Sequence, residues 1–336
     1  MKRLTGCMAL VGAVSVVASG LVAGPASKPA DMSKPVKVFI LMGQSNMVGM
    51  GSLATLTEAV KTKNKYPYLI DEKGEWISRQ DVRFVRVMQG KGGGMQLFNN
   101  EPMTVAKCKS IGPEFGIANV VGDAIDAPVM ILKSCIGNRS LGWDLLPPGS
   151  EPYDGCPGYR GTPENPKGNG EKPVGAGWYA GKQYDDDVEY AKTVLADLDK
   201  FYPGAKGSEV AGFFFWQGEK DCGNAAHASN YEKNLVNFIK ALRKDFNAPN
   251  ANFVLATLGE ATKDGSKGNG KLVMDAQLAV DGATGKHPEL KGNVATVYSN
   301  PLSQGGSGNG HYNKHAETYM DVGEAMGKAM AEMLKK

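Results

Sequence analysis

A serine stands at an abrupt turn early in the chain, where the apolar run Val38–Met42 meets Gly43-Gln44-Ser45-Asn46. A serine at a tight strand-to-helix turn can expose its hydroxyl as a nucleophile, and the backbone N–H groups of such a turn can stabilise a developing negative charge. The same pattern suits a serine that caps the following helix, which is a common role at this position. Taken alone, Ser45 is therefore either a nucleophile or a helix cap.

A second polar segment, Trp216-Gln217-Gly218-Glu219-Lys220-Asp221, follows the apolar run EVAGFFF. The Gln217 side chain offers an amide donor, and Glu219 and Asp221 offer carboxylates. In the alternative interpretation these two acids only stabilise the start of a helix, and Trp216 belongs to the core. The combination of Ser45 with Gln217 favours catalysis, because serine chemistry needs an oxyanion donor as well as a nucleophile.

Serine chemistry also needs a base, normally a histidine, and the chain has four. His311 is the best placed, because it follows the last apolar run and the loop SQGGSGNG and precedes the terminal helix. For His227 and His287 we expect solvent exposure. His315 lies four residues after His311, a spacing that could bind a metal if helical, but no acidic motif completes a metal site. We therefore predict no metal and no cofactor.

Five short apolar runs predict buried strands, and segments with helical periodicity alternate with them. This alternation indicates an α/β fold with a parallel sheet and helices on both faces. Ligands of open parallel sheets bind outside the carboxyl ends of the strands, which is where the three polar segments stand. The predicted strands are Val36–Met42, Val129–Lys133, Val210–Trp216, Phe253–Leu258 and Val294–Tyr298, and the predicted helices are Pro113–Ile125, Tyr184–Phe201, Tyr231–Phe246 and Ala316–Leu334.

The first residues have the form of a secretory signal peptide, with Lys2 and Arg3 before the apolar segment Cys7–Ala23 and small residues after it. A transmembrane anchor is the alternative, but the segment is interrupted by glycines and is short against the roughly 20 apolar residues of a span. We expect a signal peptide over residues 1–26, a linker over 27–35 and a single domain over 36–336, with long loops at about 61–110 and 145–182. The expected location is secreted or periplasmic.

Charge and cysteine content say little about binding partners or disulfide pairing. The formal net charge is +3, and loss of Lys2 and Arg3 would lower it to +1, which gives no argument for binding nucleic acid or a membrane surface. An even number of cysteines in an oxidising compartment permits disulfides, but the spacing does not determine the pairs. The oligomeric state is likewise open. The cysteines after the signal segment are Cys108, Cys135, Cys156 and Cys222.

These separated motifs resemble the sialate O-acetylesterase family, which belongs to the SGNH hydrolase superfamily and includes the sixth family of carbohydrate esterases, acetylxylan esterases among them. The resemblance rests on Gly43-Gln44-Ser45-Asn46-Met47, on Trp216–Asp221 and on a histidine just before the last helix. It implies a three-layer α/β/α sandwich, flavodoxin-like, with a parallel sheet of about five strands. It also implies hydrolysis of O-acetyl esters on carbohydrates such as sialate or xylan.

By this resemblance, Ser45 is the nucleophile and His311 is the general base. The oxyanion hole would consist of the backbone N–H of Ser45, a glycine turn after the second strand, for which Gly137 is the candidate, and the Gln217 side chain. The remaining candidates, for substrate binding, are Gln44, Asn46, Asn138, Trp216 and Asp221.

One position departs from the family pattern. Such enzymes commonly place an aspartate three residues before the catalytic histidine, where this chain has Gly308. Either a backbone carbonyl orients His311 or another carboxylate does, with Glu219 the nearest candidate for the acid that fixes the imidazole. The missing aspartate keeps a non-catalytic glycan-binding protein on the same scaffold as an alternative.

Hydrolysis of non-sugar acyl esters is a further alternative. Four aromatic residues in the long second loop suit sugar rings better than acyl chains, although they could equally pack within the loop. These residues are Tyr153, Tyr159, Trp178 and Tyr179.

Overall fold

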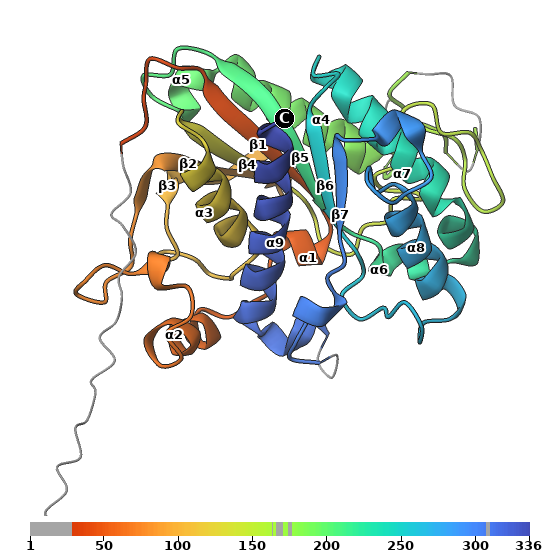
Figure 1. Ribbon diagram of the computed structural model, residues 1–336. Coiled ribbons are helices and arrows are strands. Elements are labelled where there is room, and N and C mark those ends of the chain that lie inside the picture. The colour runs from red at the N-terminus through yellow and green to blue at the C-terminus, as the bar shows by residue number, and fades with distance from the viewer. Residues whose placement is uncertain (1–28, 163, 166–170, 174–176, 307–309) are drawn as a thin grey trace, which may run out of the picture.

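The computed structural model describes residues 29–162, 164–165, 171–173, 177–306 and 310–336. Within them, seven strands form one sheet in the order β3-β2-β4-β1-β5-β6-β7 (Figure 1). All neighbouring strands are parallel except β2 and β3, which form an antiparallel pair at one edge. The strands are β1 Val36–Gly43, β2 Arg79–Gln89, β3 Met95–Met103, β4 Val129–Ser134, β5 Ser208–Trp216, β6 Asn252–Ala256 and β7 Val294–Val297.

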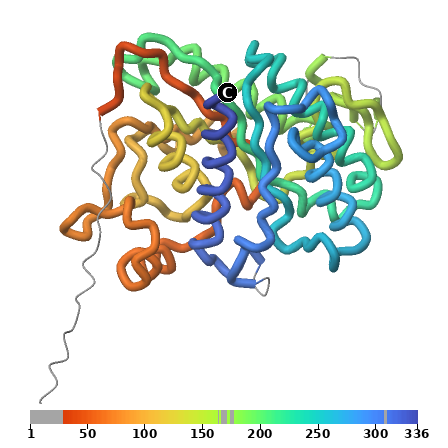
Figure 2. Tube along the Cα trace, viewed as in Figure 1, coloured from red at the N-terminus to blue at the C-terminus, as the bar shows by residue number. Residues whose placement is uncertain are grey.

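Helices cover both faces of this sheet. The long carboxyl-terminal helix α9 packs beside α3 on one face, and α4, α7 and α8 pack on the other (Figures 1 and 2). The α-helices are α1 Ser45–Val48, α2 Leu53–Lys61, α3 Glu114–Ala124, α4 Lys182–Ala196, α5 Leu198–Phe201, α6 Glu219–Cys222, α7 Ala225–Asp245, α8 Gly268–Ala279 and α9 Ala316–Leu334, and the 3-10 turns are η1 Pro67–Leu69, η2 Pro288–Leu290, η3 Asn300–Leu302 and η4 His311–Lys314.

A hydrophobic core lies on each face of the sheet, between the strands and the helices. Strand β1 belongs to both of these cores, because successive side chains of a strand point to opposite faces. Its even-numbered residues from Val36 to Met42 pack with α4, α7 and α8. Phe39 and Leu41 pack with α2, α3 and α9. A strand that is buried on both faces reads as an unbroken apolar run, which is why the sequence reveals it.

The predicted three-layer α/β fold is confirmed, and its five predicted strands are β1, β4, β5, β6 and β7. In chain order these five have the arrangement 2-1-3-4-5, so the order reverses at β1 and ligands are expected at the carboxyl ends of β1 and β5. The register pairs Gly43 with Trp216, the last residues of β1 and β5. The segments that follow the two strands therefore begin side by side at the carboxyl edge of the sheet.

The predicted elements do not include strands β2 and β3 or helices α1, α2, α6 and α8. Strands β2 and β3 lie within residues 61–110, which were expected to form a loop, and α1 and α6 are short helices of four residues each. Strand β3 is an edge strand with the sequence MQLFNNEPM, whose asparagines, glutamate and proline disfavour a strand. The predicted helix 184–201 is interrupted at Asp197 and forms α4 and α5. The described parts of 145–181 contain no strand or α-helix, as expected for a long loop.

The predicted signal peptide, residues 1–26, lies outside the described residues, as does Gly308. No described helix has the length and apolar character needed to cross a membrane.

Candidate active site

The turn that carries Ser45 is built on the main chain of β1 and β5. Gly43 has a φ of +147°, and a Cβ at this position would lie 2.4 Å from the carbonyl oxygen of Trp216, so only glycine fits. The Gln44 N–H donates a hydrogen bond to that same oxygen at 3.3 Å. The chain then enters α1 with Ser45 as its first residue.

Ser45 is not a helix cap. The capping position of α1 belongs to Gln44, whereas the next helix, α2, is capped by Ser52, whose hydroxyl accepts a hydrogen bond from the Thr55 N–H. The Ser45 residue is only 7% exposed, and within the described part of the chain its hydroxyl makes no hydrogen bond. Of the two interpretations of Ser45, the capping one is wrong.

Ser45 lines a pocket of about 740 Å³ at the carboxyl edge of the sheet. The pocket brings together the predicted nucleophile, the predicted base and the predicted oxyanion glycine. A Cβ on Gly137 would lie 3.5 Å from the Ser45 Cβ, so the backbone of Gly137 runs directly beside the serine. The lining residues are Gln44, Ser45, Met50, Gly137, Asn138, Glu219, Lys220, Gly223, Asn224, His227 and His311.

The carboxylate of Glu219 binds the nucleophile turn. Its Oε2 accepts from Gln44 Nε2 at 2.9 Å, and its Oε1 accepts from Asn46 Nδ2 at 2.6 Å. The residue is exposed toward the pocket, but both oxygens face these amides, and desolvation raises the pKa of Glu219 above its ordinary value, with the nearby Glu260 and Asp221 charges adding to the effect. No hydrogen bond joins Glu219 to His311 in the described residues, so its placement does not make it the acid partner of that histidine.

Gln217 lies behind the pocket and does not line it. Its side chain is fully buried, and Nε2 donates to Asp221 Oδ2 at 2.6 Å, to the Arg139 carbonyl at 2.9 Å and to Gln44 Oε1 at 3.3 Å. Its Oε1 accepts from the Tyr231 hydroxyl at 2.8 Å. The prediction that Gln217 donates directly to an oxyanion does not agree with this geometry, because its amide hydrogens already have protein acceptors.

Asp221 is also buried, and it binds the segment that follows the oxyanion glycine. Its carboxylate accepts from the backbone N–H groups of Leu141 and Gly142 at 2.9 and 2.8 Å, and from Gln217. Burial raises the pKa of Asp221 to about 6, against the effect of these hydrogen bonds. The structure therefore corrects its predicted contact with substrate: Asp221 fixes the wall of the pocket.

Two further predicted substrate contacts are corrected in the same way. Trp216 is fully buried, and its ring stacks on Tyr312. Asn46 is 4% exposed and donates to Glu219 and to the Tyr312 hydroxyl. The other two predicted contacts, Gln44 and Asn138, line the pocket.

His311 lies on a turn with an unusual backbone. Four consecutive residues that are not glycine, His311–Lys314, have φ between +49° and +62°. This conformation costs roughly 1–2 kcal/mol for each L-residue, so such a turn persists only where its surroundings hold it. His311 itself is exposed, and its ring makes no hydrogen bond with any described residue.

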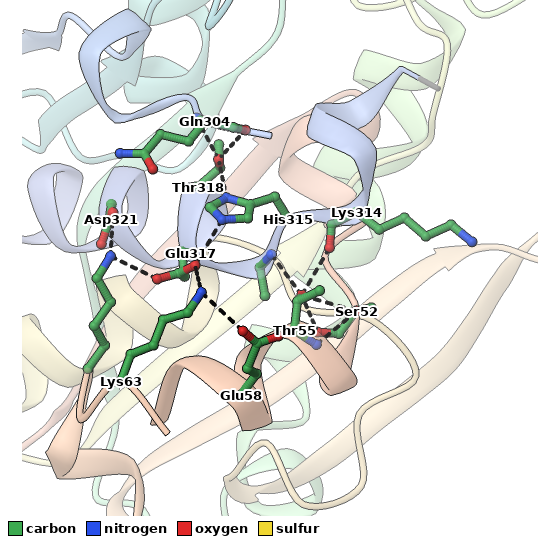
Figure 3. A network of polar contacts seen from close by, with 12 residues as sticks. Ser52, Thr55, Glu58, Lys63, Gln304, Lys314, His315, Glu317, Thr318 and Asp321 are labelled. Atoms are coloured by element: carbon green, nitrogen blue, oxygen red, sulfur yellow. Dashed lines mark hydrogen bonds and ion pairs between the residues drawn. The ribbon is translucent and has the colours of Figure 1, made fainter. Parts of the chain in front are cut away.

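The chain after this turn is fastened by the polar network in Figure 3. The Lys314 carbonyl accepts from the Ser52 N–H at 2.9 Å and from the Thr55 hydroxyl at 3.2 Å. The Thr318 hydroxyl donates to the Gln304 carbonyl at 2.8 Å. The two ends of the segment between residues 304 and 318 are therefore tied to each other and to α2.

His315 is part of this network. Its Nε2 lies 2.8 Å from Glu317 Oε2, and its Nδ1 lies 3.1 Å from the Thr318 hydroxyl. Glu317 is in turn paired with Lys63 and Lys65. The described residues contain no group of three or more His, Cys, Asp or Glu side chains arranged to hold a metal ion.

His227 lines the pocket, although the sequence led us to expect solvent exposure. It is 8% exposed, its ring meets the Tyr153 ring edge-on, and its Nε2 has no partner among the described residues. Desolvation lowers the pKa of His227, opposed by the charge of Asp144, so the imidazole is neutral at pH 7. Helix α7 starts at Ala225 rather than Tyr231, and extending the helical spacing backward from Tyr231 would have placed His227 on its buried face.

The aromatic residues of the second loop pack within the protein. The Tyr153 hydroxyl donates to the Gly142 carbonyl at 2.8 Å, and Tyr159 and Tyr179 donate to Asp185. The Trp178 indole donates to Asp144 at 2.6 Å. None of the four lines the pocket, which favours packing over a role in sugar binding. The four described cysteines are free thiols.

Residues 167–332 match the family model described as carbohydrate esterase, sialic acid-specific acetylesterase. This range includes Glu219 and His311, whereas Ser45 and Gly137 precede it. No curated protein matches the chain significantly.

Two solved structures share the fold. A protein from Arabidopsis thaliana is 17% identical with a TM-score of 0.52, over 89% of this chain and 99% of its own. A carbohydrate acetylesterase from Xanthomonas citri is 15% identical with a TM-score of 0.53, over 88% of this chain and 56% of its own. At these identities the two structures support the fold alone. The match over residues 167–332 shows that this part of the chain is similar to the carbohydrate esterase family of sialic acid-specific acetylesterases.

Proposed function

We propose that this protein is a secreted serine esterase that removes O-acetyl groups from sugars by acyl transfer between Ser45 and His311. The observation that carries the proposal is the shared pocket at the switch point of the sheet. A serine hydroxyl that makes no hydrogen bond with a described residue, a histidine and the backbone of Gly137 all line it.

In the first step, His311 takes the proton of the Ser45 hydroxyl while the serine oxygen attacks the acetyl carbonyl carbon. The backbone N–H groups of Ser45 and Gly137 stabilise the oxyanion, since the first N–H of a helix has no partner inside it. Asn138, beside Gly137 in the pocket wall, has a φ of +58° and can supply a further donor in place of Gln217.

In the second step, the sugar hydroxyl leaves with the proton that His311 carries. Water then attacks the acetyl-enzyme with His311 again as base, which releases acetate and restores the serine. Glu219 keeps the serine turn in place by accepting from Gln44 and Asn46 on either side of Ser45.

Acetate release from a chromogenic acetate ester, acetylated sialic acid and acetylated xylan tests the proposal. We expect Ser45→Ala and His311→Ala each to lower kcat/KM by a factor on the order of 10³ or more. Ser150→Ala is the matched control for the serine, because Ser150 is equally buried at 7% exposure and its hydroxyl has no partner in the described residues. His287→Ala is the control for the histidine, because His287 pairs with Glu232 outside the pocket. Undiminished hydrolysis by Ser45→Ala would refute the mechanism.

The substrate screen also decides between sugars and other acyl esters. Most residues that line the pocket have polar side chains, among them amides, a lysine and two histidines, which supports a sugar ester. We expect faster acetate release from an acetylated sugar than from long-chain acyl esters.

Export rests on the sequence of residues 1–26. We expect a protein expressed with its full sequence to be recovered outside the cytoplasm with a new N-terminus near residue 27. An unprocessed protein in the cytoplasm would contradict this part of the proposal.

A further inference from the structure

Tyr312 is the one buried residue of the turn that carries His311. Its side chain is 3% exposed, whereas His311, Asn313 and Lys314 are exposed. Tyr312 is therefore the side chain of this turn that enters the core, and it is next in sequence to the predicted base.

The Tyr312 ring is held on two sides. It stacks on Trp216 with the ring centres 6.0 Å apart at an angle of 18°, and it meets the Tyr319 ring edge-on at 5.8 Å. Trp216 ends β5 and is paired in register with Gly43. The ring contact thus places the histidine turn on the same strand end that fixes the nucleophile turn.

The Tyr312 hydroxyl contacts the nucleophile turn itself. It accepts a hydrogen bond from Asn46 Nδ2 at 3.2 Å, and the same amide donates to Glu219 at 2.6 Å. Burial raises the pKa of Tyr312 far above its ordinary value, so the phenol stays protonated. Asn46 follows Ser45 and Tyr312 follows His311, so this hydrogen bond joins the neighbours of the two predicted catalytic residues.

The surroundings leave the hydroxyl little freedom. A Cβ on Gly259 would lie 2.2 Å from the Tyr312 hydroxyl and 2.4 Å from the Ser303 hydroxyl. A Cβ on Gly305 would lie 2.2 Å from the Tyr312 carbonyl oxygen. Because Gly259 and Gly305 have no side chain, the Tyr312 hydroxyl can lie close to the first and the Tyr312 carbonyl close to the second.

We propose that Tyr312 is the positioning residue that sets the place of His311 relative to Ser45. Its ring does so by stacking on Trp216, and its hydroxyl does so by accepting the hydrogen bond from Asn46. The inference rests on the proposed Ser45–His311 mechanism. Tyr312 does not line the pocket, so it acts on turnover through His311 and leaves ground-state binding unchanged.

Replacement of the hydroxyl alone tests the inference. We expect Tyr312→Phe to lower kcat about 10-fold to 100-fold with KM changed less than about twofold, because small misplacements of a catalytic group slow the chemical step more than binding. The matched control is Tyr202→Phe, which removes a buried hydroxyl that donates to the Asp81 carbonyl at 3.4 Å, away from the pocket. The control should keep the wild-type kcat at a comparable thermal stability.

A double-mutant cycle with Asn46→Ala sharpens the test. If the hydrogen bond transmits the effect, the two substitutions together should lower kcat by less than the product of their separate factors. Full additivity, or a Tyr312→Phe enzyme with the kcat of Tyr202→Phe, would overturn the positioning role.

His311→Ala separates this inference from the mechanism. If His311→Ala is inactive while Tyr312→Phe retains full kcat, only the positioning role fails. If His311→Ala retains activity, the Ser45–His311 mechanism fails and the positioning role fails with it.

Discussion

The two turns that meet in the pocket are held in different ways. The nucleophile turn continues directly from β1, and Gly43 sits against the carbonyl of Trp216 on the neighbouring strand. The histidine turn has four residues with positive φ and is held by the Tyr312 side chain and by contacts to the Lys314 carbonyl. The backbone of the sheet thus fixes one half of the site, and side-chain anchors fix the other. Substitutions on the first side should affect stability and activity together, whereas those on the second should affect activity with little loss of stability.

The largest effect is expected from Gly43→Ala. The added methyl group meets the Trp216 carbonyl oxygen at 2.4 Å in a backbone conformation that alanine avoids. We expect kcat/KM for an acetate ester to fall by about 10³ or more, and the free energy of unfolding in denaturant to fall by about 2–4 kcal/mol.

Gly74→Ala is the control for this substitution. Gly74 also has a positive φ, +78°, but no atom lies within 4 Å of the added Cβ. It should lose about 1 kcal/mol and keep full activity. Wild-type turnover by Gly43→Ala would show that the nucleophile turn is not fixed by this contact.

Asp221→Asn should have the next largest effect. The substitution places an NH₂ group where a carboxylate accepts from Leu141, Gly142 and Gln217, so at least one donor loses its acceptor. We expect kcat/KM to fall about 10-fold to 100-fold and stability to fall by about 1–3 kcal/mol. If kinetics and denaturation both match wild type, the wall of the pocket does not depend on Asp221.

Gly259→Ala examines the histidine side. The new methyl group meets the Tyr312 and Ser303 hydroxyls at 2.2 and 2.4 Å. We expect kcat to fall about 10-fold while the thermal midpoint drops by only a few degrees, because the exposed turn can move without opening the core. Gly92→Ala is the control, since no atom lies within 4 Å of its Cβ. If Gly259→Ala lost as much stability as Gly43→Ala, the two turns would not differ in how strongly they are coupled to the stability of the fold.

The smallest effect on activity is expected from Asp187→Asn. Asp187 is buried outside the pocket, where its carboxylate accepts from Ser134 at 2.5 Å and from Gln183 at 3.0 Å. Burial raises the pKa of Asp187 to about 7, whereas an unfolded aspartate titrates near 3.9. The folded protein therefore binds an extra proton between these values, and the stability contributed by the neutral form is lost as the pH rises from about 4 to 7.

Asp187→Asn should remove this pH dependence, because its amide stays neutral and can donate to the Gln183 Oε1, which has no described partner. The quantity to compare is the unfolding free energy of the variant minus that of wild type. We expect this difference to be ~2–4 kcal/mol larger at pH 7.5 than at pH 4. Exposed Asp264→Asn serves as the control. Parallel pH curves for Asp187→Asn and wild type would contradict the raised pKa.

The sequence predicted the buried strands of the sheet and the two residues that meet in the pocket. Strands buried on both faces read as apolar runs, and Ser45 and His311 follow two of them into one pocket. Edge strand β3 escaped detection because half-exposed residues leave no continuous run. The roles of Gln217 and Asp221 were misjudged because a motif shows which groups are near the strand ends, but not which of their hydrogen bonds are already made within the protein. Tyr312 was invisible for the same reason, since its importance depends on contacts with Asn46 and Trp216, far away in the sequence.

The membership of β1 in both cores has a consequence for local opening. Detaching this strand exposes Val38 and Ile40 on one face and Phe39 and Leu41 on the other, so no partial unfolding of a single layer releases it. Backbone amides of β1 should exchange their hydrogens with solvent only through global unfolding, whereas amides of the histidine turn should exchange through small local openings. The serine would then remain in place through fluctuations that repeatedly withdraw and return its base.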